Sequence, residues 1–411
     1  MNLETRSDIM LVQFKFKNYK SFYNETILDL TATQEKRHLE DTININGNKL
    51  LPVIAIHGAN AAGKTNVLDA LSFMTRTVYF SPYFDVNKEL PVQPFLFSEN
   101  GRDEDSEFEV SLNIGDDEFR YGFSLNKNGF VDEWLFTKKF DIKSNAKEKL
   151  IFERQDGKYK FGSSFNSYEN MWKLYSSGAN NKKLLILAQI ALKEENGIFR
   201  NIYNWMIGFN SSLNDEYNLN NDRKLSVYLL KNNEKIRNDF KKMINEFDPF
   251  LVDIEIKEIE KPDKTMDTFL IGIHNVMDTN NNKLPFLSES DGTIKMFDIL
   301  PSILFSLENG SLLCIDELDT KLHPLLLKKI VNMYKDKKIN KMNAQLIYTT
   351  HSTFLFNSND LRRDQIYLVE KNELGESILY SLSEFKKLRM DADYEKKYLS
   401  GQFGGIPYNK E

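Results

Sequence analysis

The amino-acid sequence predicts an α/β protein with two lobes, in which a mixed sheet and an antiparallel lobe of hairpins accompany a helical insertion. Three observations predict this class. Short apolar runs end in glycine, carboxylate or histidine, as buried parallel strands do at the edge of an open sheet. Alternating runs separated by turn residues fill 107–157, and helical spacing dominates 165–250.

The first part of the chain is predicted to hold strands and one helix. Residues 10–30 alternate between apolar and polar side chains, which predicts two strands. Residues 50–56 are mostly apolar and predict a buried strand, and residues 64–75 predict the helix after it. Glycine-containing turns between the short runs of 107–157 predict an antiparallel sheet of hairpins.

The remaining chain is helical at first and then returns to strands. An Asn- and Asp-rich connector at 214–223 interrupts the helical spacing of 171–247. The elements expected next are strands at 251–259 and 268–276, a helix at 293–307, and buried strands at 311–317 and 345–351. We divide the chain into a first lobe (1–164), a helical insertion (165–250) and a second lobe (251–411).

Composition excludes several classes of protein. With 411 residues, 41% hydrophobic and 28% charged, the chain has the make-up of a globular protein of two or three domains. A formal charge of −6 gives no overall attraction to nucleic acid or to an anionic membrane. The single cysteine, Cys314, excludes an internal disulfide and is expected to be buried. No signal peptide or uncharged 18-residue stretch is found, so we expect a cytoplasmic protein without a membrane partner.

The most informative segment is 58–65, Gly-Ala-Asn-Ala-Ala-Gly-Lys-Thr, which fits the phosphate-loop pattern G-x-x-x-x-G-K-[ST]. Gly58 and Gly63 allow a tight turn that aims backbone N–H groups at a triphosphate. Lys64 adds positive charge for the outer phosphates, and the Thr65 hydroxyl is a ligand for Mg²⁺. A strand before the loop and a helix after it complete the expected setting, so the sequence predicts binding of a nucleoside triphosphate.

Two more segments place reactive groups at the ends of expected strands. Asp316 and Glu317 follow an apolar run; Asp316 is expected to hold Mg²⁺ directly or through water. Glu317 is expected to orient and polarise the water that attacks the γ-phosphate. His351 lies at the carboxyl end of the expected strand at 345–351 and is expected to hydrogen-bond the γ-phosphate or that water. Because parallel strands end at one edge of a sheet, these segments should converge on the phosphate loop.

The order of these motifs resembles that of ABC-type ATPases of the SMC/RecF kind. More narrowly, it resembles the AAA-type ATPases of bacterial abortive-infection and phage-defence systems, the RloA/AbiL-like group. The segments that carry the resemblance are 18–22 (Asn-Tyr-Lys-Ser-Phe), 58–65, 290–293, 315–319, 322–324, 350–352 and the tail 398–407. The likeness covers both ends of the chain better than the helical middle. It implies an ABC-ATPase-like, two-lobed nucleotide-binding domain.

The resemblance also implies a composite site made by two subunits. ATP on the phosphate loop of one subunit would be capped by Ser290 and Gly292 of the other, at the start of a helix. Asp319 would communicate across the dimer, and Gln93 is a candidate Mg²⁺ contact. The expected ATP contacts are Lys20, Ser21, Gly58, Asn60, Ala61, Ala62, Gly63, Lys64, Thr65, Asn66, Ser290, Gly292 and Asp319. The expected metal ligands are Thr65, Asp316 and Gln93, and the expected catalytic residues are Lys64, Glu317 and His351.

One position departs from the resembled pattern. The signature segment of these ATPases usually has glycine where this chain has Asp291. A carboxylate near a triphosphate is unfavourable unless it points away, which puts tight closure in question. In the alternative interpretation, Ser290 only caps the helix that starts there.

The leading functional expectation is an Mg²⁺-dependent ATPase that forms a homodimer or a larger homo-oligomer around ATP and acts as sensor or switch in phage defence. Its effector would be a separate protein encoded nearby, such as a TOPRIM-type nuclease. The alternative is a RecF/SMC-like clamp in which ATP gates DNA binding during repair or recombination. A transporter subunit is disfavoured because the segment 18–22 and the hairpin lobe do not suit one.

Overall fold

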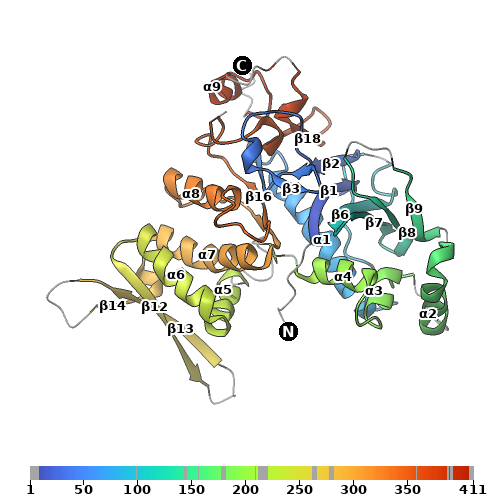
Figure 1. The fold of residues 1–411 in the computed structure, drawn as a ribbon, viewed down its shortest axis with the longest axis horizontal. Coiled ribbons are helices and arrows are strands. Elements are labelled where there is room, and N and C mark those ends of the chain that lie inside the picture. Colours follow the sequence, from blue (N-terminus) through green and yellow to red (C-terminus); the bar gives the residue numbers. More distant parts are fainter. Residues whose placement is uncertain are drawn as a thin grey trace.

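The structure is a computed structural model of the 411-residue chain (Figure 1). It describes residues 9–98, 100–142, 146–155, 157–176, 182–208, 210–211, 221–261, 266–276, 282–357, 359–386, 388 and 392–406. Most of the predicted connector, 214–220, and Pro407 of the tail lie outside the described residues.

A six-stranded sheet forms the centre of the molecule. Its order is β11 (Asn210–Ser211), β15 (Leu312–Ile315), β16 (Gln345–Thr349), β5 (Val53–Gly58), β17 (Ile366–Lys371) and β18 (Ser377–Ser381). Every neighbouring pair is parallel except β17 and β18. The carboxyl ends of β5, β15 and β16 therefore lie at the same edge.

Both faces of this sheet are buried, as its apolar strands require. Successive side chains of a strand point to opposite faces, so Ile54 and Ile56 enter one core while Val53 and Ala55 enter the other. Cys314, expected to be a buried thiol, lies in the first core. The sheet thus separates two hydrophobic cores.

The first core lies between the central sheet and a seven-stranded antiparallel sheet. That sheet has the order β10 (Lys158–Phe161), β9 (Lys149–Gln155), β8 (Gly129–Lys139), β7 (Asp117–Asn126), β6 (Ser106–Ile114), β1 (Ile9–Lys17) and β2 (Thr26–Asp29). Helix α1 (Lys64–Phe80) contacts β5 and β16 on one side and β6 on the other. The predicted lobe of hairpins is present, and the two N-terminal strands extend it.

The helical segment contributes to both cores. Helices α2 (Asn166–Ser176), α3 (Ile186–Ala191) and α4 (Ile198–Gly208) belong to the first core. Helices α5 (Asn221–Asn232) and α6 (Glu234–Phe247) pack against α7 (Asp291–Asn309) in the second. The domain boundaries proposed at 165 and 250 stay a prediction.

The second core also contains the C-terminal elements. Helix α8 (Pro324–Lys335) contacts β5 and β16, and α9 (Tyr394–Leu399) lies near the C-terminus. A three-stranded antiparallel sheet of β12 (Leu251–Glu260), β13 (Met266–His274) and β14 (Lys283–Pro285) extends away from α5–α7 (Figure 1). A small hairpin of β3 (Ile43–Ile45) and β4 (Asn48–Leu50) precedes β5. In the part of the chain that the structure describes, no helix is long and apolar enough to cross a membrane. The predicted α/β class with two lobes is confirmed.

Candidate functional site

The segment 58–65 forms a closed loop between β5 and α1. Lys64 lies inside it: its Nζ donates to Gly58 O at 2.9 Å and to Ala59 O at 3.0 Å. Burial lowers the pKa of Lys64, and the carboxylates of Asp316, Glu317 and Asp319 oppose that shift. The first N–H groups of α1 have no partner within the helix and lie at its positive end. The loop therefore combines a buried ammonium group with backbone donors.

Gly63 is required by its neighbours as well as by its backbone. Its φ of 116° is unfavourable for other residues, and a Cβ there would collide with the hydroxyls of Ser377 and Ser21. Ser377 Oγ donates to Ala62 O at 2.5 Å and is hydrogen-bonded to Ser21 Oγ at 2.8 Å. Ser21 Oγ also accepts from Asn66 Nδ2 at 2.8 Å. Ser21 and Asn66, both predicted to contact ATP, are therefore linked to the loop backbone through Ser377.

The Asp316–Glu317 segment contacts the phosphate loop through a hydrogen bond between two side-chain oxygens. Thr65 Oγ1 donates to Asp316 Oδ2 at 2.9 Å, which brings together two segments 251 positions apart. Thr349 Oγ1 donates to Asp316 Oδ1 at 2.5 Å and accepts from the Glu317 N–H at 2.7 Å. Sequence reasoning missed Thr349, although its place at the carboxyl end of β16 was a signal. Two of the three expected metal ligands therefore lie side by side.

Glu317 and His351 face each other beside this pair. His351 Nε2 lies 4.0 Å from Glu317 Oε1, and their side chains are 37% and 51% exposed. Glu317 has a φ of 48°, a left-handed conformation that costs a non-glycine residue about 1 kcal/mol. The His351 N–H donates to both carboxylate oxygens of Asp319, at 3.2 and 3.3 Å. An ionisable pair is thus held in contact with solvent beside the phosphate loop.

The segment 18–22 brings Lys20 and Gln93 near the loop. Lys20 Nζ pairs with Asp69 Oδ2 of α1 at 2.6 Å, and the Lys20 N–H donates to Gln93 O at 2.7 Å. The Gln93 side chain is exposed. The expected roles of Lys20 at the nucleotide and of Gln93 at the metal stay predictions.

Ser290 and Gly292 form the start of α7. Ser290 is the N-cap, and its Oγ accepts from the Thr293 N–H at 3.1 Å. Gly292 lies against the backbone of Lys321, and Lys321 Nζ pairs with Asp291 Oδ1 at 3.3 Å. The helix cap considered as an alternative is present. The Lys321 pair also balances the unexpected carboxylate of Asp291.

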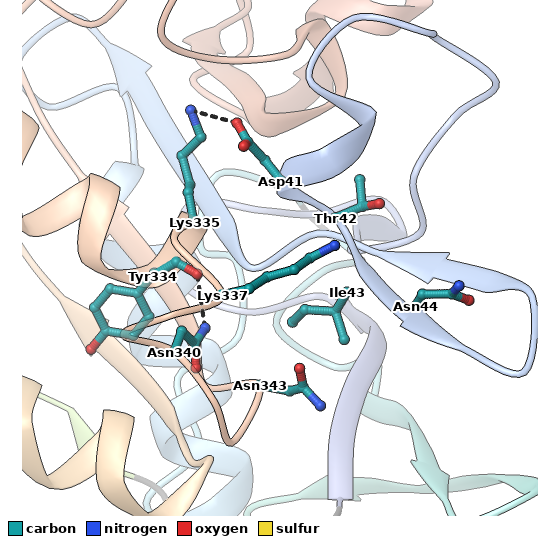
Figure 2. A pocket seen from close by; sticks show the side chains of 9 residues that line it. All are labelled: Asp41, Thr42, Ile43, Asn44, Tyr334, Lys335, Lys337, Asn340 and Asn343. Carbon is teal, nitrogen blue, oxygen red and sulfur yellow. Dashed lines mark hydrogen bonds and ion pairs between the residues drawn. The ribbon is translucent and has the colours of Figure 1, made fainter.

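A pocket of about 210 Å³ lies at a different edge of the central sheet, at the amino end of β16 (Figure 2). Lys335 Nζ pairs there with Asp41 Oδ2 at 2.9 Å, and Lys337 reaches toward Thr42 (Figure 2). Asn340 Nδ2 donates to Tyr334 O and Ala344 O. Because the phosphate loop follows the carboxyl end of the parallel strand β5, this pocket is separate from it.

His57 is a buried titratable group in β5, directly before the loop. Its ring meets the Phe356 ring edge to face, with centroids 4.7 Å apart, and its Nε2 is buried without a hydrogen-bond partner. Burial lowers the pKa of His57 to about 3, with smaller contributions from the charges of Lys64 and His351. The folded protein therefore holds this imidazole neutral.

His57 should make stability depend on pH. In the unfolded chain a histidine takes up a proton near pH 6.5, whereas folded His57 resists it down to about pH 3. The free energy of unfolding should therefore fall as pH falls through that window, by about 1.4 kcal/mol per unit from this residue. His57→Phe keeps the ring contact and should remove this part of the slope in urea unfolding at pH 7.5, 6.0 and 5.0. Equal slopes in both proteins would contradict the assignment.

The convergence of this loop, the Thr65–Asp316 pair and Glu317 at one edge of a parallel sheet defines a phosphate-loop ATP-binding protein. A sequence model of the family described as "AAA domain, putative AbiEii toxin, Type IV TA system" matches residues 53–357. The chain belongs to this family, so the expected membership of the AAA-type ATPases is confirmed.

Two solved structures of the recombination mediator protein RecF of the RecFOR pathway are also similar. The RecF-ATPrS structure has 13% sequence identity and a TM-score of 0.33, covering 92% of this chain and 99% of that chain. The RecF-ATP structure has the same identity and TM-score, with 93% and 99% covered. No curated protein matches the chain.

Proposed function

We propose that the protein is an Mg²⁺-dependent ATPase that dimerises around ATP and acts in the cytoplasm as the switch subunit of an anti-phage defence system. The observation that carries the enzymatic part is the 2.9 Å contact between Thr65 and Asp316 beside the exposed Glu317. The contact supports the proposal because both side chains carry oxygens of the kind that bind Mg²⁺, and the carboxylate of Glu317 beside them is half exposed.

The residues present fit a magnesium ion. Mg²⁺ prefers oxygen ligands and is commonly held by one or two protein groups together with the phosphates of its substrate. Thr65 Oγ1 and Asp316 Oδ2 are two such oxygens, already within 2.9 Å of each other. They would hold the ion, whose charge would stabilise the β- and γ-phosphates. Lys64 would exchange its two carbonyl partners for phosphate oxygens.

Glu317 is the group best placed to act on water. Its carboxylate is half exposed, and Thr320 Oγ1 donates to its Oε2 at 3.2 Å, which orients the side chain. It would accept a hydrogen bond from the attacking water and polarise it toward the γ-phosphate. His351, 4.0 Å away, would contact the same water or the γ-phosphate. Asp319 holds the backbone of His351 and so links this group to the loop after Glu317.

Dimerisation would complete the site. Ser290 and Asp291 are exposed at the positive end of α7, where backbone N–H groups are available to an anion. A second subunit would present this end to the ATP on the first. Because Asp291 is paired with Lys321, the carboxylate at this position is compatible with closure.

The role in defence rests on the family and on the resemblance of the motifs to abortive-infection ATPases. An ATP-driven switch needs an effector, and we propose a separate nuclease, of TOPRIM type, as the partner. Affinity purification of the tagged protein from its host should recover that partner. A protein that purifies alone both before and during phage infection would contradict the switch role.

Gel mobility-shift experiments separate this proposal from an ATP-gated DNA clamp. We expect weak binding of duplex DNA, because the net charge is −6. We also expect ATP to leave this binding unchanged. Glu317→Gln, expected to hold ATP, should bind DNA no better than wild type. Tight binding of DNA only with ATP, and without any partner, would favour the clamp.

A further inference from the structure

The three-stranded sheet β12–β14, here called the projecting sheet, is joined to the start of α7. Figure 1 shows this sheet extending away from helices α5–α7. At its base, Asp248 ends α6 just before β12, and Asp248 Oδ2 accepts from Thr293 Oγ1 at 3.0 Å. The Thr293 hydroxyl also lies 2.9 Å from Ser290 Oγ. One end of the sheet is therefore bonded to the helix cap.

The same end of the sheet reaches the cap a second time, through a histidine of β13 that pairs in register with Leu251, the first residue of β12. His274, the last residue of β13, has its Nε2 2.8 Å from Glu289 Oε1. An ionised carboxylate only accepts, so this hydrogen bond requires the imidazole tautomer with its proton on Nε2. The Glu289 side chain is 4% exposed and that of His274 is 18% exposed. Hydrogen bonds to a charged group that is shielded from water are stronger than those on an open surface.

Strand β13 leaves room for the contact between His274 and Glu289 because it has a glycine beside that contact. Gly272 lies two residues before His274 on the same face of β13, and a Cβ at this position would collide with the Glu289 carboxylate. His274 is further fixed because its N–H donates to Asn282 O at 2.8 Å. Glu289 directly precedes Ser290, so its side chain fixes the backbone that enters the helix.

We propose that His274 is a positioning residue of the composite ATP site. Through Glu289, it holds Ser290 in the place from which one subunit caps the ATP of the other. The projecting sheet thereby sets the geometry of the cap without touching the nucleotide of its own subunit. This inference rests on the proposed function of an ATPase that works as a dimer.

The kinetic test compares three variants of the full-length protein. His274→Ala should lower kcat for ATP at least tenfold, because small displacements of a catalytic group cost that much. Its affinity for ADP, which the phosphate loop of one subunit binds, should be unchanged in calorimetry. His274→Gln retains an N–H donor and should restore most of the rate. Lys283→Ala, which breaks the 2.7 Å pair with Glu255 in the same sheet, is the control and should match wild type.

A rate unchanged in His274→Ala would overturn the proposal. So would an equal loss in Lys283→Ala, because the effect would then come from the stability of the sheet as a whole. A loss of ADP affinity in His274→Ala would also overturn it, since the residue would then act within its own subunit.

Hydrogen exchange tests the link without ATP. The Thr293 N–H donates to Ser290 Oγ and the Ile294 N–H to Ser290 O, so both report on the cap. In His274→Ala these amides should exchange faster, whereas in Lys283→Ala they should not. Unchanged exchange would overturn the proposal. If the wild-type protein hydrolysed no ATP, the proposed function would fail, and the exchange data would still decide whether His274 holds the cap.

Mixed dimers show on which subunit His274 acts. A dimer of His274→Ala with Lys64→Ala contains one site with an intact loop and an intact cap. The mixture should therefore hydrolyse ATP faster than either variant alone and recover part of the wild-type rate. Mass spectrometry would show that the mixture contains the mixed dimer. If such a mixture recovered no activity, the proposal that His274 acts on the ATP site of the other subunit would be overturned.

Discussion

Lys64→Ala is expected to abolish ATP binding measurable by calorimetry. Lys64 is 6% exposed, and its ammonium group is held at the centre of the loop by the carbonyls of Gly58 and Ala59. A bound triphosphate would take over these hydrogen bonds with charged oxygens in a partly desolvated site. Removing one member of such a pair costs about 2–5 kcal/mol, which corresponds to roughly 30-fold to several thousand-fold in affinity.

The control for this experiment is the same substitution at a lysine outside the phosphate loop. Lys173 is exposed in α2 and pairs with Glu169, one turn away, so Lys173→Ala should bind ATP as wild type does. Thermal unfolding of Lys64→Ala should remain cooperative, since the change removes a side chain at the loop and leaves both cores intact. Wild-type affinity in Lys64→Ala would contradict the assignment of the phosphate loop.

The central parts of this site are predictable because each is a local pattern at the end of a strand. The phosphate loop, the Asp316–Glu317 pair and His351 each follow an apolar run, and parallel strands bring such ends to one edge. The structure places them there. The same reasoning predicted the hairpin lobe, since alternation and turns are local as well.

What the sequence could not predict depends on contacts between distant segments. Ser377 bonds Ser21 and the backbone of Ala62 from positions 356 and 315 residues away, and no local pattern indicates it. The helices between 165 and 250 carry apolar stripes, but a stripe does not say which of two cores it faces. The bond from His274 to Glu289 likewise arises only when β13 folds beside the start of α7.

Glu317→Gln is expected to keep ATP binding and to slow hydrolysis by about 100-fold or more. The amide has the shape of the carboxylate, so the turn at φ 48° and the contact with Thr320 can persist. It lacks the negative charge that polarises water, and a general base contributes about 10²–10⁴-fold to a rate. Loss in kcat with unchanged ATP affinity is the signature of an interaction made in the transition state.

A second consequence follows from the dimer. If ATP holds two subunits together and hydrolysis releases them, Glu317→Gln should accumulate ATP-bound dimers, seen as a shift in size-exclusion chromatography with light scattering. Glu153→Gln, at an exposed pair with Lys160 in the seven-stranded sheet, is the matched control and should stay as wild type does. If Glu317→Gln stayed monomeric in the presence of ATP, the proposal of an ATP site shared by two subunits would be wrong. Normal turnover in Glu317→Gln would mean that another group polarises the attacking water. His351, 4.0 Å from Glu317, would then be the next residue to substitute.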